Sequence, residues 1–118
     1  ILGNLQVQNL PSSATQNQIC GATVGGILAY QYSAAPVQIG GASCAANKVK
    51  GNLIVQYNTA ATLLIGNTIN GNLQDNSNTA PTQVTGNTVG NNLQCQNNTA
   101  ITGGGNTAKQ KQGQCAAF

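Results

Sequence analysis

The chain has 118 residues and its charged side chains are four lysines and the single acid Asp75, which gives a net charge of +3 without any histidine, arginine or glutamate. This composition excludes a Ser-His-Asp arrangement, a pair of catalytic carboxylates and a carboxylate-rich metal site, so we expect no enzymatic activity, no cofactor and no metal. Lysines in two separate pairs are too few for nucleic-acid binding, and apolar runs such as residues 63–65 are far shorter than the roughly 20 residues of a membrane helix.

Two irregular repeats open the chain. Residues 3–25 read GNLQVQNLPSSATQNQICGATVG, and residues 26–50 read GILAYQYSAAPVQIGGASCAANKVK. The first carries extra residues after Asn9, and the second carries an insertion around residues 44–48. Apolar and polar residues alternate in both, which is typical of half-buried strands. Helices are not expected, because glycine, asparagine, threonine and β-branched residues dominate and no 3.6-residue period is present.

Three regular repeats of twenty residues follow, at residues 51–70, 71–90 and 91–110, and residues 111–118 form a tail. Alignment of the five repeats produces three columns of apolar residues. The first column contains Leu5, Leu28, Leu53, Leu73 and Leu93. The other two contain Ile19, Ile39, Leu64 and Val84, and Val24, Val49, Ile69, Val89 and Ala108.

Short strands that recur every twenty residues predict a parallel β-helix, or β-solenoid, an all-β fold in which each turn stacks on the next. We expect residues 1–118 to form a single domain of about five turns, with up to three strands in each turn. The turns would lie about 4.8 Å apart, and the apolar columns would fill a narrow core.

Asparagines recur at two corners of each turn, in the sequences GNT and NTA. A stacked asparagine amide can donate to one neighbour and accept from the other, and asparagine tolerates the left-handed backbone of a corner. We therefore expect two structural ladders; ligand contacts are the alternative. The predicted ladders are Asn67, Asn87 and Asn106 at one corner and Asn58, Asn78 and Asn98 at the other.

The four cysteines predict two disulfides. Cys95 and Cys115 are twenty residues apart, so we expect them to share one column on adjacent turns, within the range that a disulfide bridges. Cys20 and Cys44 would form the remaining pair; free thiols are the alternative. The spacings contain no CxxC pair, which argues against zinc. Disulfides indicate an oxidising setting, so we expect a secreted, extracellular or cell-surface protein.

Three further features leave functional alternatives open. Asp75 falls in a mostly apolar column and is expected at the rim, hydrogen-bonded near a corner. A hydroxyl column suggests ice binding, but the second column that such a face usually has is missing; its members are Thr23, Ser43, Thr68, Thr88 and Thr107. Glutamines together with Tyr30, Tyr32 and Tyr57 could line a flat face for glycans, but simple stacking of Tyr32 on Tyr57 is the favoured explanation of the tyrosines. The glutamines of that face are Gln6, Gln74, Gln94 and Gln114, and Gln8, Gln31, Gln56 and Gln96.

The run GNTVGNNLQCQNN…GGGNTAKQKQGQC resembles the endings of a group of secreted bacterial repeat proteins that carry GNLQ…GNTVGGNLQC…GGGNT…GQC. The resemblance covers residues 51–118 closely and 1–50 loosely. It implies a right-handed β-helix exported from a bacterium, and no established activity. Turn length and the valine and glycine pattern are also similar to those of the bactofilins, β-helix proteins that polymerise end to end. The cysteines depart from that second pattern, since bactofilins are cytosolic.

The two ends of the predicted stack differ. Lys109, Lys111 and a disulfide would close the C-terminal end, whereas no charge run or helix covers Ile1 and Leu2. We expect a structural protein that self-associates end to end into an extracellular filament or surface layer, with Ile1, Leu2 and Phe118 at the contacts. The alternative is a C-terminal adhesin-like or carbohydrate-binding module of a larger exported protein.

Overall fold

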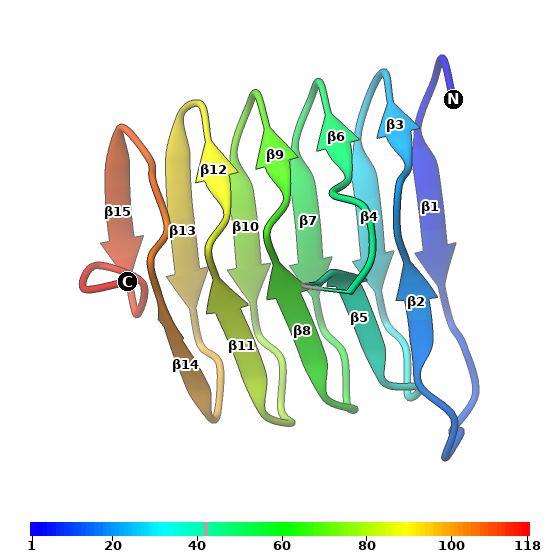
Figure 1. Ribbon diagram of the computed structural model, residues 1–118. Coiled ribbons are helices and arrows are strands. Elements are labelled where there is room, and N and C mark those ends of the chain that lie inside the picture. The colour runs from blue at the N-terminus through cyan, green and yellow to red at the C-terminus, as the bar shows by residue number, and fades with distance from the viewer. Residues whose placement is uncertain (42) are drawn as a thin grey trace.

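The computed structural model describes residues 1–41 and 43–118. The chain winds into a solenoid of about five turns, each of about twenty residues, and the described residues form strands and corners without a helix (Figure 1). The predicted all-β solenoid is confirmed. The described residues therefore contain no helix that could cross a membrane.

Three parallel sheets form the walls of the solenoid, and each of the first four turns contributes one strand to each wall. The six-stranded sheet contains β1 (Leu5–Gln8), β4 (Leu28–Gln31), β7 (Leu53–Gln56), β10 (Leu73–Asn76), β13 (Asn92–Gln96) and β15 (Gln110–Gly113). The five-stranded sheet contains β2 (Asn17–Ile19), β5 (Val37–Gly40), β8 (Thr62–Ile65), β11 (Thr82–Thr85) and β14 (Ile101–Gly104). The four-stranded sheet contains β3 (Thr23–Val24), β6 (Lys48–Val49), β9 (Thr68–Ile69) and β12 (Thr88–Val89).

The three predicted apolar columns run in register through these sheets. Leu5 pairs with Leu28, and the leucine column continues turn by turn to Leu93. The isoleucine and valine columns of the other two sheets pair in the same way. Their side chains meet in one core, where full burial of each contributes about 1.5–3 kcal/mol. A single turn has no second layer against which to bury these side chains, so the stack is the stable unit.

The corners use a left-handed backbone in two different ways. Glycines serve at the corner after the five-stranded sheet, where Gly66, Gly86 and Gly105 have φ of 66–68°. At the corner after the six-stranded sheet, five other residues have φ of 53–59°. These residues are Asn9, Tyr32, Tyr57, Ser77 and Asn97. Asparagine adopts this conformation readily, whereas for a bulky residue such as tyrosine it is strained.

One predicted column is wrong. Thr23 pairs with Lys48, and Lys48 pairs with Thr68, so Lys48 and not Ser43 occupies this position of the hydroxyl column. The reason is the insertion in the second turn: the regular path resumes at Asn47, which directly precedes β6. The interruption by a lysine also removes the continuous hydroxyl row on which the ice-binding alternative depended.

The end of the chain is more ordered than the predicted tail at 111–118. Residues from Gln110 form β15, a sixth strand on the long sheet, in which Lys111 pairs with Leu93 and Gln112 with Gln94. Gln112 and not Gln114 therefore continues the glutamine column. Cys95 pairs with Gly113, so the prediction that Cys95 and Cys115 share a column is wrong by two residues, because the last turn is shorter than twenty residues.

Candidate functional site

The asparagine ladders at the two corners are present and buried. Asn67 Nδ2 donates to Asn87 Oδ1, and Asn87 Nδ2 to Asn106 Oδ1, each at 3.0 Å. At the other corner, Asn58 donates to Asn78 at 3.0 Å and Asn78 to Asn98 at 3.1 Å. The same Oδ1 atoms also accept the backbone N–H of the preceding asparagine.

Each ladder amide also donates a hydrogen bond to a backbone carbonyl. Asn87 Nδ2 donates to the carbonyl of Leu64 at 2.9 Å, and Asn106 Nδ2 to that of Val84 at 2.9 Å. Corner carbonyls that leave the strand register would otherwise be buried without a partner. A further ladder member was not predicted: Asn47 donates to Asn67 Oδ1 at 2.9 Å, and the insertion before it hid its register. Because these side chains face inward, they are structural and offer no ligand surface.

The tail terminates both ladders. Gln114 Oε1 accepts the backbone N–H of Asn98 at 2.9 Å and its side-chain Nδ2 at 3.0 Å. The carbonyl of Phe118 accepts the N–H of Asn106 at 3.1 Å and its Nδ2 at 3.3 Å. Gln114 and Phe118 thus supply the acceptors that another turn of asparagines would have supplied. Gly103 leaves room for the ring of Phe118, because a Cβ at position 103 would lie 2.7 Å from a ring carbon.

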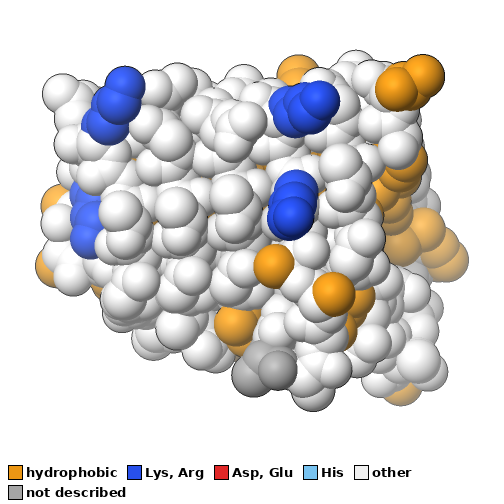
Figure 2. Space-filling view, turned by 45° about the horizontal axis from the view of Figure 1, so that its top comes forward, with side chains coloured by type: hydrophobic (Ala, Val, Ile, Leu, Met, Phe, Trp, Pro, Cys, Tyr) orange, Lys and Arg blue, Asp and Glu red, His pale blue; other side chains and the backbone are white. Residues whose placement is uncertain are grey.

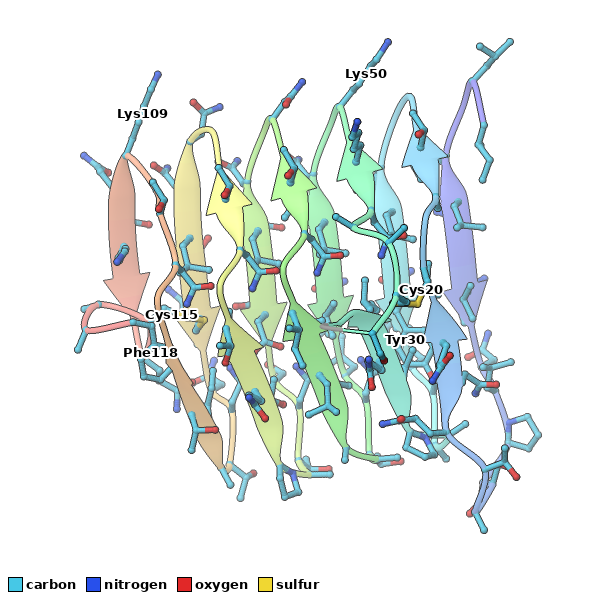
Figure 3. The ribbon with its side chains drawn as sticks, in the orientation of Figure 1. Cys20, Tyr30, Lys50, Lys109, Cys115 and Phe118 are labelled. Carbon is cyan, nitrogen blue, oxygen red and sulfur yellow. A yellow bond between two sulfur atoms is a disulfide. The ribbon has the colours of Figure 1, made fainter. Side chains whose placement is uncertain are left out.

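Both predicted disulfides are present. Cys20 and Cys44 have Cα atoms 5.7 Å apart, and Cys95 and Cys115 have Cα atoms 5.3 Å apart. The first ties the insertion of the second turn to the first turn, and the second holds the tail against the fifth turn (Figure 3). Two disulfides in a chain of this size indicate that it matures in an oxidising compartment outside the cytoplasm.

The N-terminal end of the stack is open. Within the described residues, β1 pairs with β4 and β2 with β5, and their outer edges have no partner strand. Leu5, Val7 and Ile19 are only partly buried, although the same columns are fully buried in the second turn. Ile1 and Leu2 are 61% and 102% exposed. Figure 2 shows apolar side chains gathered at this end of the molecule.

Asp75, the single acidic side chain of the sequence, lies in the core. Its side chain is fully buried in the column between Val55 and Cys95, so the prediction of a rim position is wrong. Asp75 Oδ1 accepts Asn78 Nδ2 at 2.6 Å, as expected for a residue near a corner, whereas Oδ2 has no partner among the described residues. Burial raises the pKa of Asp75 to about 7, and the hydrogen bond from Asn78 opposes that rise in part. A lone carboxyl without access to solvent has no nucleophile or second acid to act with.

The predicted tyrosine and glutamine face is partly assembled. The rings of Tyr32 and Tyr57 are stacked with centroids 5.0 Å apart and planes 9° apart, and they are 54% and 48% exposed. Tyr30 does not belong to this face, because it is fully buried in the core and donates its hydroxyl to the carbonyl of Ala35 at 2.6 Å (Figure 3).

A glutamine ladder precedes the stacked tyrosines on the same strands. Gln31 Nε2 donates to Gln8 Oε1 at 3.2 Å, and Gln56 Nε2 donates to Gln31 Oε1 at 2.9 Å. The register continues this row through Asn76 to Gln96. The outer face of the six-stranded sheet therefore carries a row of amides that leads to the tyrosine pair, and both offer hydrogen bonds or flat apolar area to solvent.

Other site chemistry is limited by the composition. Residues 1–41 and 43–118 contain no cluster of three or more histidine, cysteine, aspartate or glutamate side chains that could hold a metal. A shallow groove of about 190 Å³ lies beside Lys48 and Lys50 on the four-stranded sheet. No family model matches the chain, and neither a curated protein nor a solved structure is significantly similar to it.

Proposed function

We propose that the protein is a non-enzymatic carbohydrate-binding module of a secreted or cell-surface β-solenoid, and that it binds through Tyr32, Tyr57 and the amides beside them. The observation that carries this proposal is the exposed tyrosine pair on a left-handed backbone. The left-handed conformation costs about 1–2 kcal/mol for each tyrosine, whereas stacking of the two rings returns about 0.5–1.5 kcal/mol. Stability alone therefore does not account for tyrosine at these positions.

The neighbours of the pair suit a sugar ring. On one side the corner column continues with Asn9 and on the other with Ser77, and both side chains are shorter than tyrosine. The outer faces of the two rings are therefore not covered by another aromatic ring. A pyranose ring could extend the stack at the next turn, beside the amides of Gln56 and Asn76, of which Asn76 Oδ1 is buried.

The matched variants for a test come from the column itself. Tyr32→Asn and Tyr57→Asn place at each site the residue that the same corner already has at Asn9 and Asn97. We expect each variant to fold with unchanged or higher stability and to lose binding to neutral oligosaccharides at least tenfold, as measured by calorimetry after an array of β-linked glycans has identified a ligand. Gln18→Asn, on the exposed part of β2, is the control. Failure of every neutral glycan, or equal binding by Tyr57→Asn, would refute the proposal.

End-to-end stacking into a filament or surface layer is a second candidate, and the open N-terminal end favours it. The free edges of β1 and β2 and the half-buried Leu5, Val7 and Ile19 would be covered by a further solenoid turn. At the other end, Gln114 and Phe118 already close the ladders, so the tail would lie between stacked copies. This arrangement also suits a module whose N-terminal end rests on further turns of a longer solenoid.

Light scattering across a concentration series, with negative-stain electron microscopy, separates the two candidates. Fibres with an axial repeat near 5 Å in diffraction would support stacking, and Phe118→Ala should then weaken assembly if the tail lies at the contact. A monomer at high concentration would refute the filament and leave the carbohydrate-binding proposal intact.

A further inference from the structure

We propose that the groove beside Lys48 and Lys50 is an anion site, which binds a sulfate or carboxylate group of an acidic polysaccharide. The groove has a volume of about 190 Å³, enough for such a group. It is lined by Thr23, Lys48, Val49, Lys50, Thr68 and Asn70. This inference rests on the proposed function, because it assumes that the ligand is a polysaccharide. It adds that this polysaccharide is negatively charged.

The register places both ammonium groups on one surface. Lys48 and Lys50 flank the buried Val49, so their side chains leave the same outer face of the four-stranded sheet at positions about 7 Å apart along the chain. Thr23 and Thr68 pair with Lys48 from the two neighbouring strands, about 5 Å to either side. Asn70 stands in the position of Lys50 on the next turn, as their backbone bonds to Val49 and Val24 show. Hydroxyl and amide donors therefore surround the two cations.

No acidic side chain opposes these charges. Asp75 is the only acidic side chain in the chain, and it is fully buried in the six-stranded sheet. Figure 2 shows lysine side chains on this face and no acidic one. Lys48 and Lys50 carry like charges on this face, and an anion bound between them would be attracted by both. An ion in a groove is also less screened than one on an open surface.

Protection of a sheet edge does not explain these lysines, although it explains the other pair. Lys109 and Lys111 lie at the last turn, where β15 presents a free edge (Figure 3). Lys48 lies on β6, which is paired on both sides by β3 and β9. The equivalents of Lys48 on the neighbouring turns are threonines, so the solenoid does not need a lysine at this position.

A polysaccharide is the carrier that fits the surroundings of the groove. Nucleic acid draws its affinity from several phosphate contacts along a basic stripe, and here two lysines stand alone. Lys50 lies at the corner that leads from β6 into β7, and Tyr57 directly follows β7, so the two residues flank the same four-residue strand. A single oligosaccharide that follows the outer face of β7 and passes this corner onto the four-stranded sheet would contact both.

The test compares two double variants with the same change in charge. Lys48→Thr/Lys50→Asn replaces the pair by the residues of the next turn, Thr68 and Asn70. Lys109→Asn/Lys111→Gln is the matched control at the edge. Calorimetry would measure the affinity of the intact chain for a sulfated oligosaccharide and for its unsulfated counterpart, at two salt concentrations. NMR would follow the amides of residues 22–24, 48–50 and 68–70 during titration with sodium sulfate alone.

We expect the wild-type chain to bind the sulfated form at least tenfold more tightly, and the groove variant to lose that preference while the edge variant keeps it. Sodium sulfate should shift the groove amides first. Equal loss in both variants, or equal affinity for both oligosaccharides, would overturn the inference. If Tyr57→Asn loses the unsulfated form without any sulfate preference in the wild type, this inference fails and the proposed function stands. If unsulfated oligosaccharides do not bind but the sulfated one binds through the lysines, this inference stands and the proposed binding of neutral sugars by the tyrosine pair fails.

Discussion

At the scale of single residues, Asp75 shows how a polar chain tolerates an ionisable group in its core. Asn78 Nδ2 faces three acceptors, the carbonyl of Val55 at 3.2 Å, Asp75 Oδ1 at 2.6 Å and Asn98 Oδ1 at 3.1 Å, although an amide has two hydrogens. An ionised Asp75 would hold one of the two amide hydrogens strongly and would weaken the bond from Asn78 to Asn98 in the ladder. A protonated Asp75 places less demand on Asn78, and burial favours that neutral form.

The stability of the protein should therefore fall as the pH rises toward 7. The folded pKa of Asp75, about 7, lies above its ordinary value of 3.8, so the folded state binds the proton more tightly. The contribution is complete below pH 3.8, is lost progressively up to about pH 7 and is constant above it, a total of about 4 kcal/mol. The chain has no histidine or glutamate, so no other side chain titrates in this range.

Asp75→Asn should remove this dependence. We expect the midpoint of urea unfolding, followed by circular dichroism, to fall between pH 4 and pH 8 for the wild type and to stay level for the variant. The variant should be the more stable of the two at pH 8. Asp75→Val, which places the residue of the preceding turn in the column, should also be level. A slope that persists in both variants would show that Asp75 is not its source.

At the scale of elements, the corners do as much for the fold as the strands. The short strands bury one or two inward side chains each, and the asparagines between them satisfy the backbone groups that leave the register. An amide placed between turns acts on both neighbours, because it accepts from the turn before and donates to the turn after. A corner asparagine should therefore contribute more than a single hydrogen bond.

Asn87→Ala should destabilise the protein by about 3 kcal/mol, because it removes four hydrogen bonds and takes the side-chain partner from the buried N–H of Asn67 and the carbonyl of Leu64. Asn91→Ala is the control: its side chain is exposed, and the change should stay within about 0.5 kcal/mol. Chemical denaturation at fixed pH measures both. If the two losses were alike, the buried ladder would have no special role.

At the scale of the whole molecule, the parts that repeat could be predicted and the parts that break the repeat could not. Columns of Leu53, Leu73 and Leu93, with the asparagines between them, define the register wherever the period is twenty. The insertion before Asn47 and the shortened turn before Cys115 change the period, so Ser43, Gln114 and Cys115 were placed wrongly. The period gives the column of a residue but not how deeply its side chain is buried when that side chain differs from the rest of the column. For this reason the sequence predicts a rim position for Asp75, whereas its side chain is fully buried.

The cap formed by Gln114 could not be predicted for the same reason, and it has a consequence for the whole stack. A solenoid turn contacts only its neighbours, so loss of a cap should loosen the end without unfolding the rest. Gln114→Ala leaves the backbone N–H of Asn98 without an acceptor, and its Nδ2 keeps only the carbonyl of Asp75. We expect the amide of Asn98 to exchange with deuterium at least tenfold faster, since one lost hydrogen bond is worth about 1 kcal/mol and a buried unpaired donor costs more.

The amides of Asn58 and Asn67, two turns away, should exchange as in the wild type, as measured by native-state hydrogen exchange with NMR detection. Gln112→Ala is the control, because the Gln112 side chain donates its hydrogen bond to the exposed Gln110 and takes no part in either ladder, so the change should affect neither end. Faster exchange along the whole chain in Gln114→Ala would contradict local fraying. It would mean that the ladders couple all turns into one cooperative unit, and that the tail stabilises the first turn, at the open end, as much as the last.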